Sequence, residues 1–156
     1  MKRPITGFDT DEEGDWRAIL GCGHRQHVRH RPPFIDRPWV ITEEGRRGKL
    51  GAELECVRCD NFELPEGFVA WRATPLYTHE TVPAALTTDH RTKPATWAKI
   101  IVLEGALRYQ VPPLGRTFVL DCAHPGIVLP EVEHRVAPLG PLRFYLEFYR
   151  APETGA

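Results

Sequence analysis

The sequence predicts a mainly β protein in which a small module cross-linked by a metal ion precedes a β-sandwich or jelly roll. The chain carries 13 glycines and 15 prolines among 156 residues, which leaves few uninterrupted stretches of the ~12 residues that a typical helix occupies. Short runs of β-branched and aromatic residues recur through its second half. Cysteines and histidines gather in its first 60 residues, where a metal ion is the expected reason.

The overall composition is that of an ordinary soluble globular protein. Hydrophobic residues make up 42% of the chain and charged residues 26%, with 20 basic against 21 acidic side chains. Collagen-like and wholly disordered chains are thereby excluded. No run approaches the roughly 18 apolar residues of a membrane-spanning helix. Residues 1–9 contain no apolar segment of the kind that a secretory signal needs, so we expect a cytoplasmic protein.

In the first half, the pattern predicts a hairpin and one short helix. The runs Ile5–Phe8 and Trp16–Leu20 flank the acidic, glycine-containing segment 9–15, which is typical of a hairpin with a long loop. Thr42 is a candidate N-cap for a short helix that continues to about Lys49, because two acidic residues follow it. Glycines inside that segment weaken the helix.

In the second half, the pattern predicts seven short strands. Runs at 97–103 and 106–111 are separated by Glu104 and Gly105, which we interpret as a two-residue turn. The other expected strands are 68–73, 117–121, 126–129, 134–137 and 142–149. Strands of this number and spacing indicate a sandwich or jelly roll. Proline and glycine in the segment 61–67 mark a junction, so we expect one domain over residues 1–66 and another over 67–156.

The first half contains two pairs of metal-ligand residues. Cys22-Gly23-His24 is followed by Cys56-Val57-Arg58-Cys59, and such turns bring two side chains onto one ion. The favoured ligands of a structural zinc ion are Cys22, His24, Cys56 and Cys59. His27 and His30 compete for the histidine position. The alternatives are buried apolar cysteines or a redox pair, which the matching upstream Cys-x-His disfavours.

This half resembles a small bacterial domain of unknown function. The likeness rests on Cys22 to His30, on Pro32-Pro33 and on Cys56 to Asp60, and it implies no activity. Because zinc modules often present basic residues to phosphates, nucleic acid could bind through Arg25, Arg29 and Arg31. A solvated basic face is the favoured interpretation because the chain has no net positive charge, so we expect no nucleic-acid partner.

The second half resembles the cupin superfamily. Residues 125–136 are similar to its second motif, in which glycine opens a strand, proline ends it and histidine begins the next. Residues 90–105 resemble its first motif, with two departures. Thr92 stands where that motif has a second histidine, and Ala98 stands in place of its glutamate. The four-ligand metal site of the superfamily therefore cannot be assembled.

A reduced metal site remains possible in this half. The resemblance implies that His90 and His134 point into the barrel. Glu147 lies in an otherwise apolar, aromatic run, so it must be paired, protonated or bound to a cation if it points inward. Two imidazoles and one carboxylate would hold a divalent ion of undetermined identity. The alternative for Glu147 is an outward ion pair with Arg143 or Arg108.

Three further residues are candidates for binding a substrate. Lys93 could attract an anionic ligand, although a surface lysine is the commoner case. Tyr109 and Tyr145 could line the barrel, although aromatic residues in strands usually belong to the core. Cys122 and His124 are expected to be structural or exposed.

Several motifs in the same order resemble, more specifically, the cupin-like domain of the TehB-type tellurite-resistance family. The likeness spans about residues 68 to 151, and its carriers are 80–84, 90–93, Trp97, 103–105, Leu107, Tyr109, Pro130, His134 and 147–149. It implies a double-stranded β-helix, a possible homodimer and a link to tellurite or nitrosative stress. The methyltransferase part known in some members has no counterpart here, since no glycine-rich nucleotide motif is present.

Three functions follow as hypotheses. The first is a metal-dependent cupin that binds or transforms a small, anionic or oxidised molecule at His90, His134 and Glu147. The second is a binding or sensing module without catalysis. The third is a zinc module that contacts nucleic acid. The sequence does not decide whether the protein is an enzyme.

Overall fold

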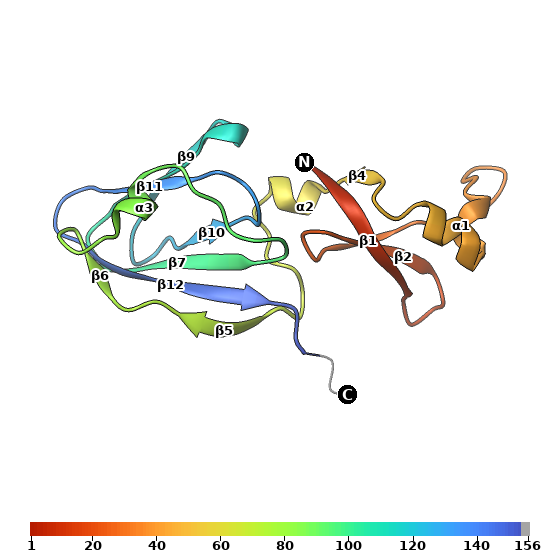
Figure 1. Cartoon of the computed structure of the whole chain (residues 1–156), viewed down its shortest axis with the longest axis horizontal. Coiled ribbons are helices and arrows are strands. Elements are labelled where there is room, and N and C mark those ends of the chain that lie inside the picture. Colours follow the sequence, from red (N-terminus) through yellow and green to blue (C-terminus); the bar gives the residue numbers. More distant parts are fainter. Residues whose placement is uncertain (154–156) are drawn as a thin grey trace. The chain divides into compact units, whose positions relative to one another are not determined.

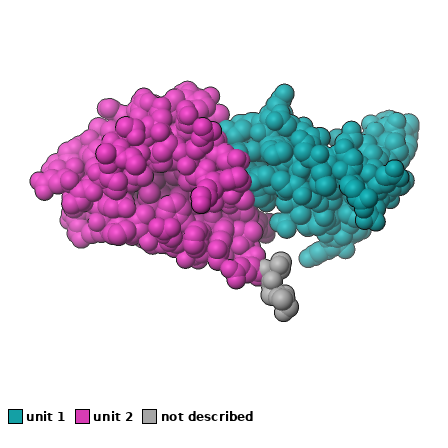
Figure 2. All heavy atoms as spheres, in the orientation of Figure 1, with its two compact units in different colours: residues 1–61 teal, residues 62–156 magenta. Residues whose placement is uncertain are grey.

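The computed structural model describes residues 1–153 and contains two compact units, residues 1–61 and the residues from 62 onward (Figure 2). Strands dominate both units (Figure 1), so the mainly β prediction is confirmed. None of the helices among the described residues is long and apolar enough to cross a membrane.

Unit 1, residues 1–61, is built on one antiparallel sheet. Its strands, in spatial order, are β3 (Arg25–His27), β2 (Trp16–Leu20), β1 (Lys2–Thr10) and β4 (Glu53–Glu55). The predicted hairpin is confirmed, since Thr10 pairs with Trp16 and Phe8 with Ala18. The Asp11 carboxylate closes the connecting loop by accepting backbone hydrogen bonds from Glu13 and Asp15, both at 2.9 Å.

Three short helical segments complete unit 1. They are the 3₁₀ helix η1 (Pro38–Ile41), α1 (Glu43–Gly48) and α2 (Val57–Asp60). The predicted helix after Thr42 is confirmed as α1, because the Thr42 hydroxyl accepts a hydrogen bond from the Gly45 backbone N–H at 3.0 Å. Helix α2 is a single turn that begins directly after Cys56.

Unit 2 contains two antiparallel sheets (Figure 1). The larger sheet has the order β10 (Gly126–Val128), β7 (Trp97–Glu104), β12 (Arg143–Arg150) and β5 (Val69–Ala73), with β6 (Tyr77–Thr78) also pairing β12. The smaller sheet has the order β11 (Arg135–Pro138), β8 (Leu107–Val111) and β9 (Arg116–Leu120). The short helices α3 (Ala84–Thr87) and η2 (Pro112–Leu114) lie in connections.

The interpretation of Glu104 and Gly105 as a hairpin turn is wrong. Strands β7 and β8 belong to different sheets, so the chain crosses from one sheet to the other at this point. Gly105 has a φ of +79°, and a Cβ there would lie 2.0 Å from the carbonyl oxygen of Pro141. Sequence periodicity cannot distinguish this crossing from a hairpin, because both need a tight glycine-containing turn.

The core of unit 2 is formed by side chains that alternate along the strands. Trp97, Tyr109 and Phe144 are its largest fully buried residues. Along β12, Phe144 and Leu146 are buried whereas Tyr145 and Glu147 are half-buried. Since alternate residues of a strand point to opposite faces, this pattern assigns 144, 146 and 148 to one face and 145, 147 and 149 to the other.

We expect Gly105→Ala to destabilise the chain by about 3 kcal/mol, because the new Cβ meets backbone as well as adopting a positive φ. Gly115→Ala is the matched control: its φ is +60°, but nothing lies within 4 Å of the added Cβ. It should cost about 1 kcal/mol. Denaturant unfolding measures both, and equal losses would contradict the steric argument.

Candidate functional site

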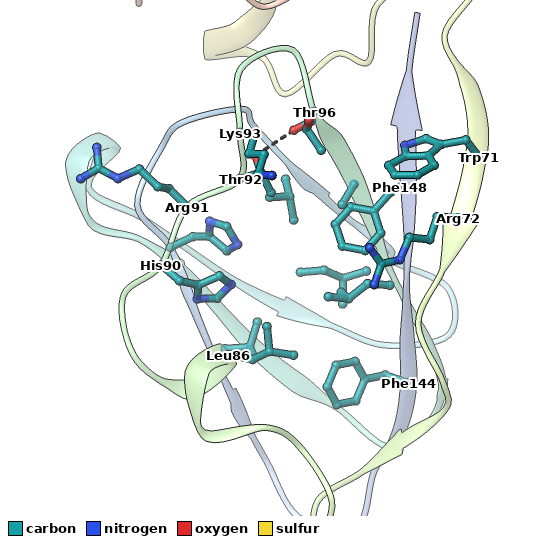
Figure 3. A pocket seen from close by; sticks show the side chains of 16 residues that line it. Trp71, Arg72, Leu86, His90, Arg91, Thr92, Lys93, Thr96, Phe144 and Phe148 are labelled. Carbon is teal, nitrogen blue, oxygen red and sulfur yellow. Dashed lines mark hydrogen bonds between the residues drawn. The ribbon is translucent and has the colours of Figure 1, made fainter. Parts of the chain in front are cut away.

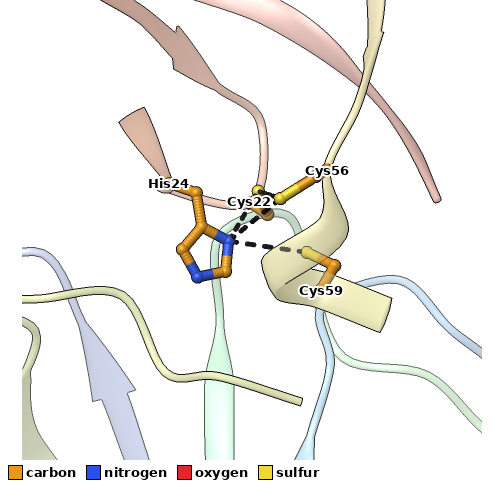
Figure 4. A group of neighbouring side chains, drawn as sticks. All are labelled: Cys22, His24, Cys56 and Cys59. Atoms are coloured by element: carbon orange, nitrogen blue, oxygen red, sulfur yellow. Dashed lines mark hydrogen bonds between the residues drawn. The ribbon is translucent and has the colours of Figure 1, made fainter. Parts of the chain in front are cut away.

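Unit 1 brings together four potential metal ligands from two distant segments (Figure 4). Cys22 and His24 lie in the turn after β2, where Gly23 adopts a φ of +97°. Cys56 precedes α2, and Cys59 lies within it. Because Cys56 and Cys59 are about one helical turn apart, they lie on the same side of α2. The side chains of all four residues are buried.

The separations within this Cys/His cluster fit a tetrahedral ion. The Nδ1 atom of His24 lies 3.4 Å from the Sγ of Cys22, 3.3 Å from that of Cys56 and 3.6 Å from that of Cys59. The Sγ atoms of Cys22 and Cys56 are 3.9 Å apart. Zinc bonds of about 2.3 Å to sulfur and about 2.0 Å to nitrogen separate ligand atoms by roughly 3.5–3.8 Å. The group could therefore hold a metal such as zinc.

Without a metal ion, the cluster shares protons among its donor groups. Hydrogen bonds from the neighbouring thiols lower the pKa of Cys56 and raise that of Cys59. Burial lowers the pKa of His24, but the hydrogen bonds to Cys22 and Cys56 outweigh it and raise this pKa to about 9. A metal ion that binds thiolates and neutral imidazole would therefore have to displace protons from this cluster.

The competing histidines lie elsewhere. The Nε2 atom of His27 is 2.7 Å from a carboxylate oxygen of Asp11. The Nδ1 atom of His30 accepts a hydrogen bond from the Arg37 backbone N–H at 2.9 Å. Neither residue belongs to the Cys/His cluster among the described residues. Of the three histidines, His24 is the one in the group that could hold a metal ion.

The arginines proposed as a nucleic-acid surface, Arg25, Arg29 and Arg31, form ion pairs with aspartates of unit 1. Arg25 lies 2.6 Å from Asp9. Arg29 and Arg31 both contact the Asp15 carboxylate, at 3.0 and 3.1 Å. These ion pairs reduce the positive potential that phosphates would need. The hypothesis of a nucleic-acid surface gains no support from this arrangement.

Unit 2 contains a cavity of about 340 Å³ whose wall includes His90 and His134 (Figure 3). The backbones of these two residues form an isolated antiparallel bridge, with N–H to O distances of 3.0 and 2.9 Å. Their ring centroids lie 4.1 Å apart. The predicted histidine pair is therefore brought together in the structure.

The orientation of both imidazoles is fixed by backbone carbonyl groups. The Nδ1 atom of His90 lies 2.9 Å from the Thr88 oxygen, and that of His134 lies 3.0 Å from the Val132 oxygen. Burial lowers the pKa of His134 to about 4. At neutral pH the His134 ring is accordingly uncharged.

The rest of the cavity wall is largely apolar, with cations among its polar residues. Its apolar side chains come from both sheets and from α3: Trp71, Leu86, Ala98, Ile100, Val128, Val136, Phe144, Leu146 and Phe148. Arg72, Arg91 and Lys93 add positive charge, and no acidic residue is among the described residues that line the cavity. Arg91 has Glu133 at 4.0 Å. Such a surface suits a small molecule with an apolar body and a negative charge.

The structure does not bring Glu147 to the histidine pair. Glu147 lies on the face of β12 opposite to the residues that line the cavity, because Phe144, Leu146 and Phe148 occupy the cavity face. Its carboxylate accepts a hydrogen bond from the Tyr149 hydroxyl. The expected three-ligand set is therefore a wrong prediction. Among the described residues, no third metal-binding side chain joins His90 and His134.

The substrate-binding candidates have different outcomes. Lys93 lines the cavity as expected. Tyr145 shares the outer face of β12 with Glu147, so it does not line this cavity. Tyr109 is a core residue: it is 1% exposed, and its hydroxyl donates to the Ile127 oxygen at 2.8 Å. Its ring packs edge-on against His134.

Sequence reasoning missed the contribution of β5 and of the cavity face of β12. Arg72 and Trp71 lie on an exposed edge strand, where neither residue type signals a site. Phe148 could have been found from the alternation 144, 146, 148 once Phe144 is assigned to the core.

These features define a mainly β protein with a buried Cys/His cluster in one unit and a ligand-sized cavity in the other. Residues 6–63 match the family model described as "Protein of unknown function (DUF3565)". Residues 72–146 match the model described as "TehB-like domain". The resemblances to a small domain of unknown function and to the TehB-type family are thereby confirmed.

Two solved structures are similar to part of this chain. A crystal structure of a protein from E. coli (strain K12) superposes with a TM-score of 0.55 at 21% identity, covering 60% of this chain and 92% of that chain. The crystal structure of TehB from Haemophilus influenzae gives a TM-score of 0.51 at 27% identity, covering 55% of this chain and 32% of that chain. No curated protein matches the chain.

We expect the purified full chain to carry about one zinc ion, and Cys59→Ala to lose it, because three ligands hold a structural ion poorly. Cys122→Ala is the control, since Cys122 is exposed and lies outside the Cys/His cluster. Elemental analysis of the three proteins provides the measurement. A wild-type chain without metal, or a Cys59→Ala chain with full occupancy, would contradict the assignment.

Burial of His134 should make unit 2 less stable in acid. The unfolded chain takes up a proton below the ordinary pKa of 6.5, whereas the folded unit does so only near pH 4. Stability is therefore complete above about pH 6.5 and is lost as the pH falls toward 4, by about 2 kcal/mol between about pH 7 and pH 5. Denaturant unfolding of wild type and His134→Gln measures this loss.

The control is His124→Gln, because His124 is exposed. This variant should keep the wild-type dependence on pH, whereas His134→Gln should flatten it. Identical slopes for wild type and His134→Gln would show that His134 is not the group responsible.

Proposed function

We propose that unit 2 binds a small organic anion in the cavity beside His90 and His134, as a binding or sensing module, and that unit 1 is a zinc-stabilised companion. The observation that carries this proposal is the cavity of about 340 Å³, with its apolar wall, two histidines and cationic residues. Its size lies within the usual range for small-molecule sites.

Charge favours an anion over a neutral or cationic ligand. Arg72 lies over the Phe148 ring at 5.9 Å, and the described residues offer it no carboxylate within ion-pair distance. Lys93 likewise has no carboxylate partner in the described part of the chain. Both side chains are exposed, so their attraction for an anion is modest and depends on salt.

A metal-dependent reaction in this cavity has weaker support. The two imidazoles lack the carboxylate that a divalent site of this kind would need, because Glu147 lies on the far face of β12. Thr92 stands where the first cupin motif has a second histidine. Its hydroxyl donates a hydrogen bond to the Thr96 oxygen at 2.8 Å. The described residues therefore do not fit a three-ligand ion, and we assign the cavity no catalytic step.

For unit 1 we infer a structural zinc ion. Cys22, His24, Cys56 and Cys59 would saturate a tetrahedral ion and leave no position for a substrate. When bound, the ion would supply the cross-link between the β2 turn and α2. Reduced thiols of this kind persist in a reducing compartment, which supports a cytoplasmic location.

The fold of unit 2 supports a cupin-type double-stranded β-helix within a tellurite-resistance-related family. Two antiparallel sheets contribute side chains to one cavity, as in barrels that hold a ligand. The match to the TehB-like domain supports the family. The chain covers only a third of the TehB structure, so a role in tellurite or nitrosative stress is part of the proposal.

Titration calorimetry on the full chain tests this function with benzoate and its uncharged analogue benzamide. We expect benzoate to bind about tenfold more tightly, because Arg72, Arg91 and Lys93 line the cavity and no acidic residue does among the described residues. Arg72→Met and Lys93→Met should each weaken benzoate binding severalfold. Arg108→Met is the control, since Arg108 is exposed and does not line the cavity. Equal affinities for benzoate and benzamide would contradict the proposal.

A further inference from the structure

The histidine pair exposes a defined hydrogen-bonding pattern to the cavity. A backbone carbonyl oxygen only accepts hydrogen bonds, so the Nδ1 atoms that lie 2.9 Å from the Thr88 oxygen and 3.0 Å from the Val132 oxygen must carry the ring protons. In an uncharged imidazole the other nitrogen is then an acceptor. Both Nε2 atoms are thus left as acceptors, and neither has a hydrogen-bond partner in the described part of the chain.

The position of these acceptors is set by the backbone. His90 and His134 exchange two backbone hydrogen bonds, so the rings stay 4.1 Å apart. Each ring is also held by a carbonyl only two residues earlier in its own segment. The site is therefore preorganised for a donor, and a ligand without one would leave these acceptors without a partner from the ligand.

The positively charged side chain of Arg72 lies on another side of the same cavity. In Figure 3 the Arg72 side chain enters from β5, across the cavity from His90. Phe144 and Phe148 line the cavity together with apolar residues from both sheets. A ligand that meets both polar sides must therefore span an apolar middle.

From this arrangement we infer the class of ligand. We propose that the cavity recognises a small organic acid that carries a hydroxyl or N–H donor across an apolar body from its anionic group. The donor meets Nε2 of His90 or His134, and the anion meets Arg72. This inference rests on the proposed function, to which it adds the requirement for a donor.

A bound cation is the principal competitor for the two acceptors. The cavity wall opposes it, because Arg72, Arg91 and Lys93 are positive and no acidic residue lines the cavity among the described residues. An uncharged donor group meets the same acceptors without that repulsion.

The test compares 4-hydroxybenzoate with 4-methylbenzoate, in which a methyl group of similar size replaces the donor. Both are titrated into the full chain near neutral pH. We expect the hydroxyl compound to bind about tenfold more tightly. His90→Phe or His134→Phe should reduce this ratio at least threefold. His124→Phe should leave it unchanged, because His124 lies outside the cavity.

The outcomes separate this inference from the proposed function. If both acids bind equally well, anion binding stands and the donor requirement is overturned. If neither acid binds, both proposals fail. If the ratio is unchanged in both cavity variants, the histidines are not the acceptors.

A second measurement does not depend on the variants folding. Long-range ¹H–¹⁵N spectra of the wild-type chain report which ring nitrogen carries the proton. We expect Nε2 of both His90 and His134 to give the signal of an unprotonated nitrogen. A proton on either Nε2 atom would overturn the acceptor assignment for that residue.

Discussion

The paired backbone hydrogen bonds between His90 and His134 are the interaction on which the cavity of unit 2 depends. They join the segment before β7 to the segment before β11, which lie in different parts of the sequence. Thr92 adds a second link, because its backbone oxygen accepts from the Glu131 N–H at 3.1 Å. These backbone hydrogen bonds hold the two histidine segments together, so the polar side of the cavity is preorganised for a ligand.

The corresponding feature of unit 1 is its Cys/His cluster, which could hold a metal ion. Its sheet is small, and several of its buried side chains are the Cys/His cluster itself. A unit of about 60 residues buries little apolar surface, so a metal cross-link is a physically reasonable substitute for a larger core. Its arginines are used in ion pairs with Asp9 and Asp15.

Local sequence patterns predicted the helices and strands well, but they predicted some of the strand pairings wrongly. Alternation and turn residues indicated most strands of unit 2, and Thr42 indicated the start of α1. The pairing of β7 and β8 was wrong, because a tight turn at Gly105 serves a crossing between sheets as readily as a hairpin. The apolar neighbours of Glu147 leave both an inward and an outward side chain open, and the strand register places it on the outer face.

The sequence alone determined the chemistry that is available: three cysteines and a histidine at ligand spacing, two histidines beside barrel-like motifs, and a mainly β chain. Only the tertiary structure decided which side chains meet. Ligand spacing is local, so the Cys/His cluster could be inferred from its two turns. The cavity is formed by residues from several strands, whose facing depends on register and sheet order. Those quantities are set by long-range packing, which no local pattern contains.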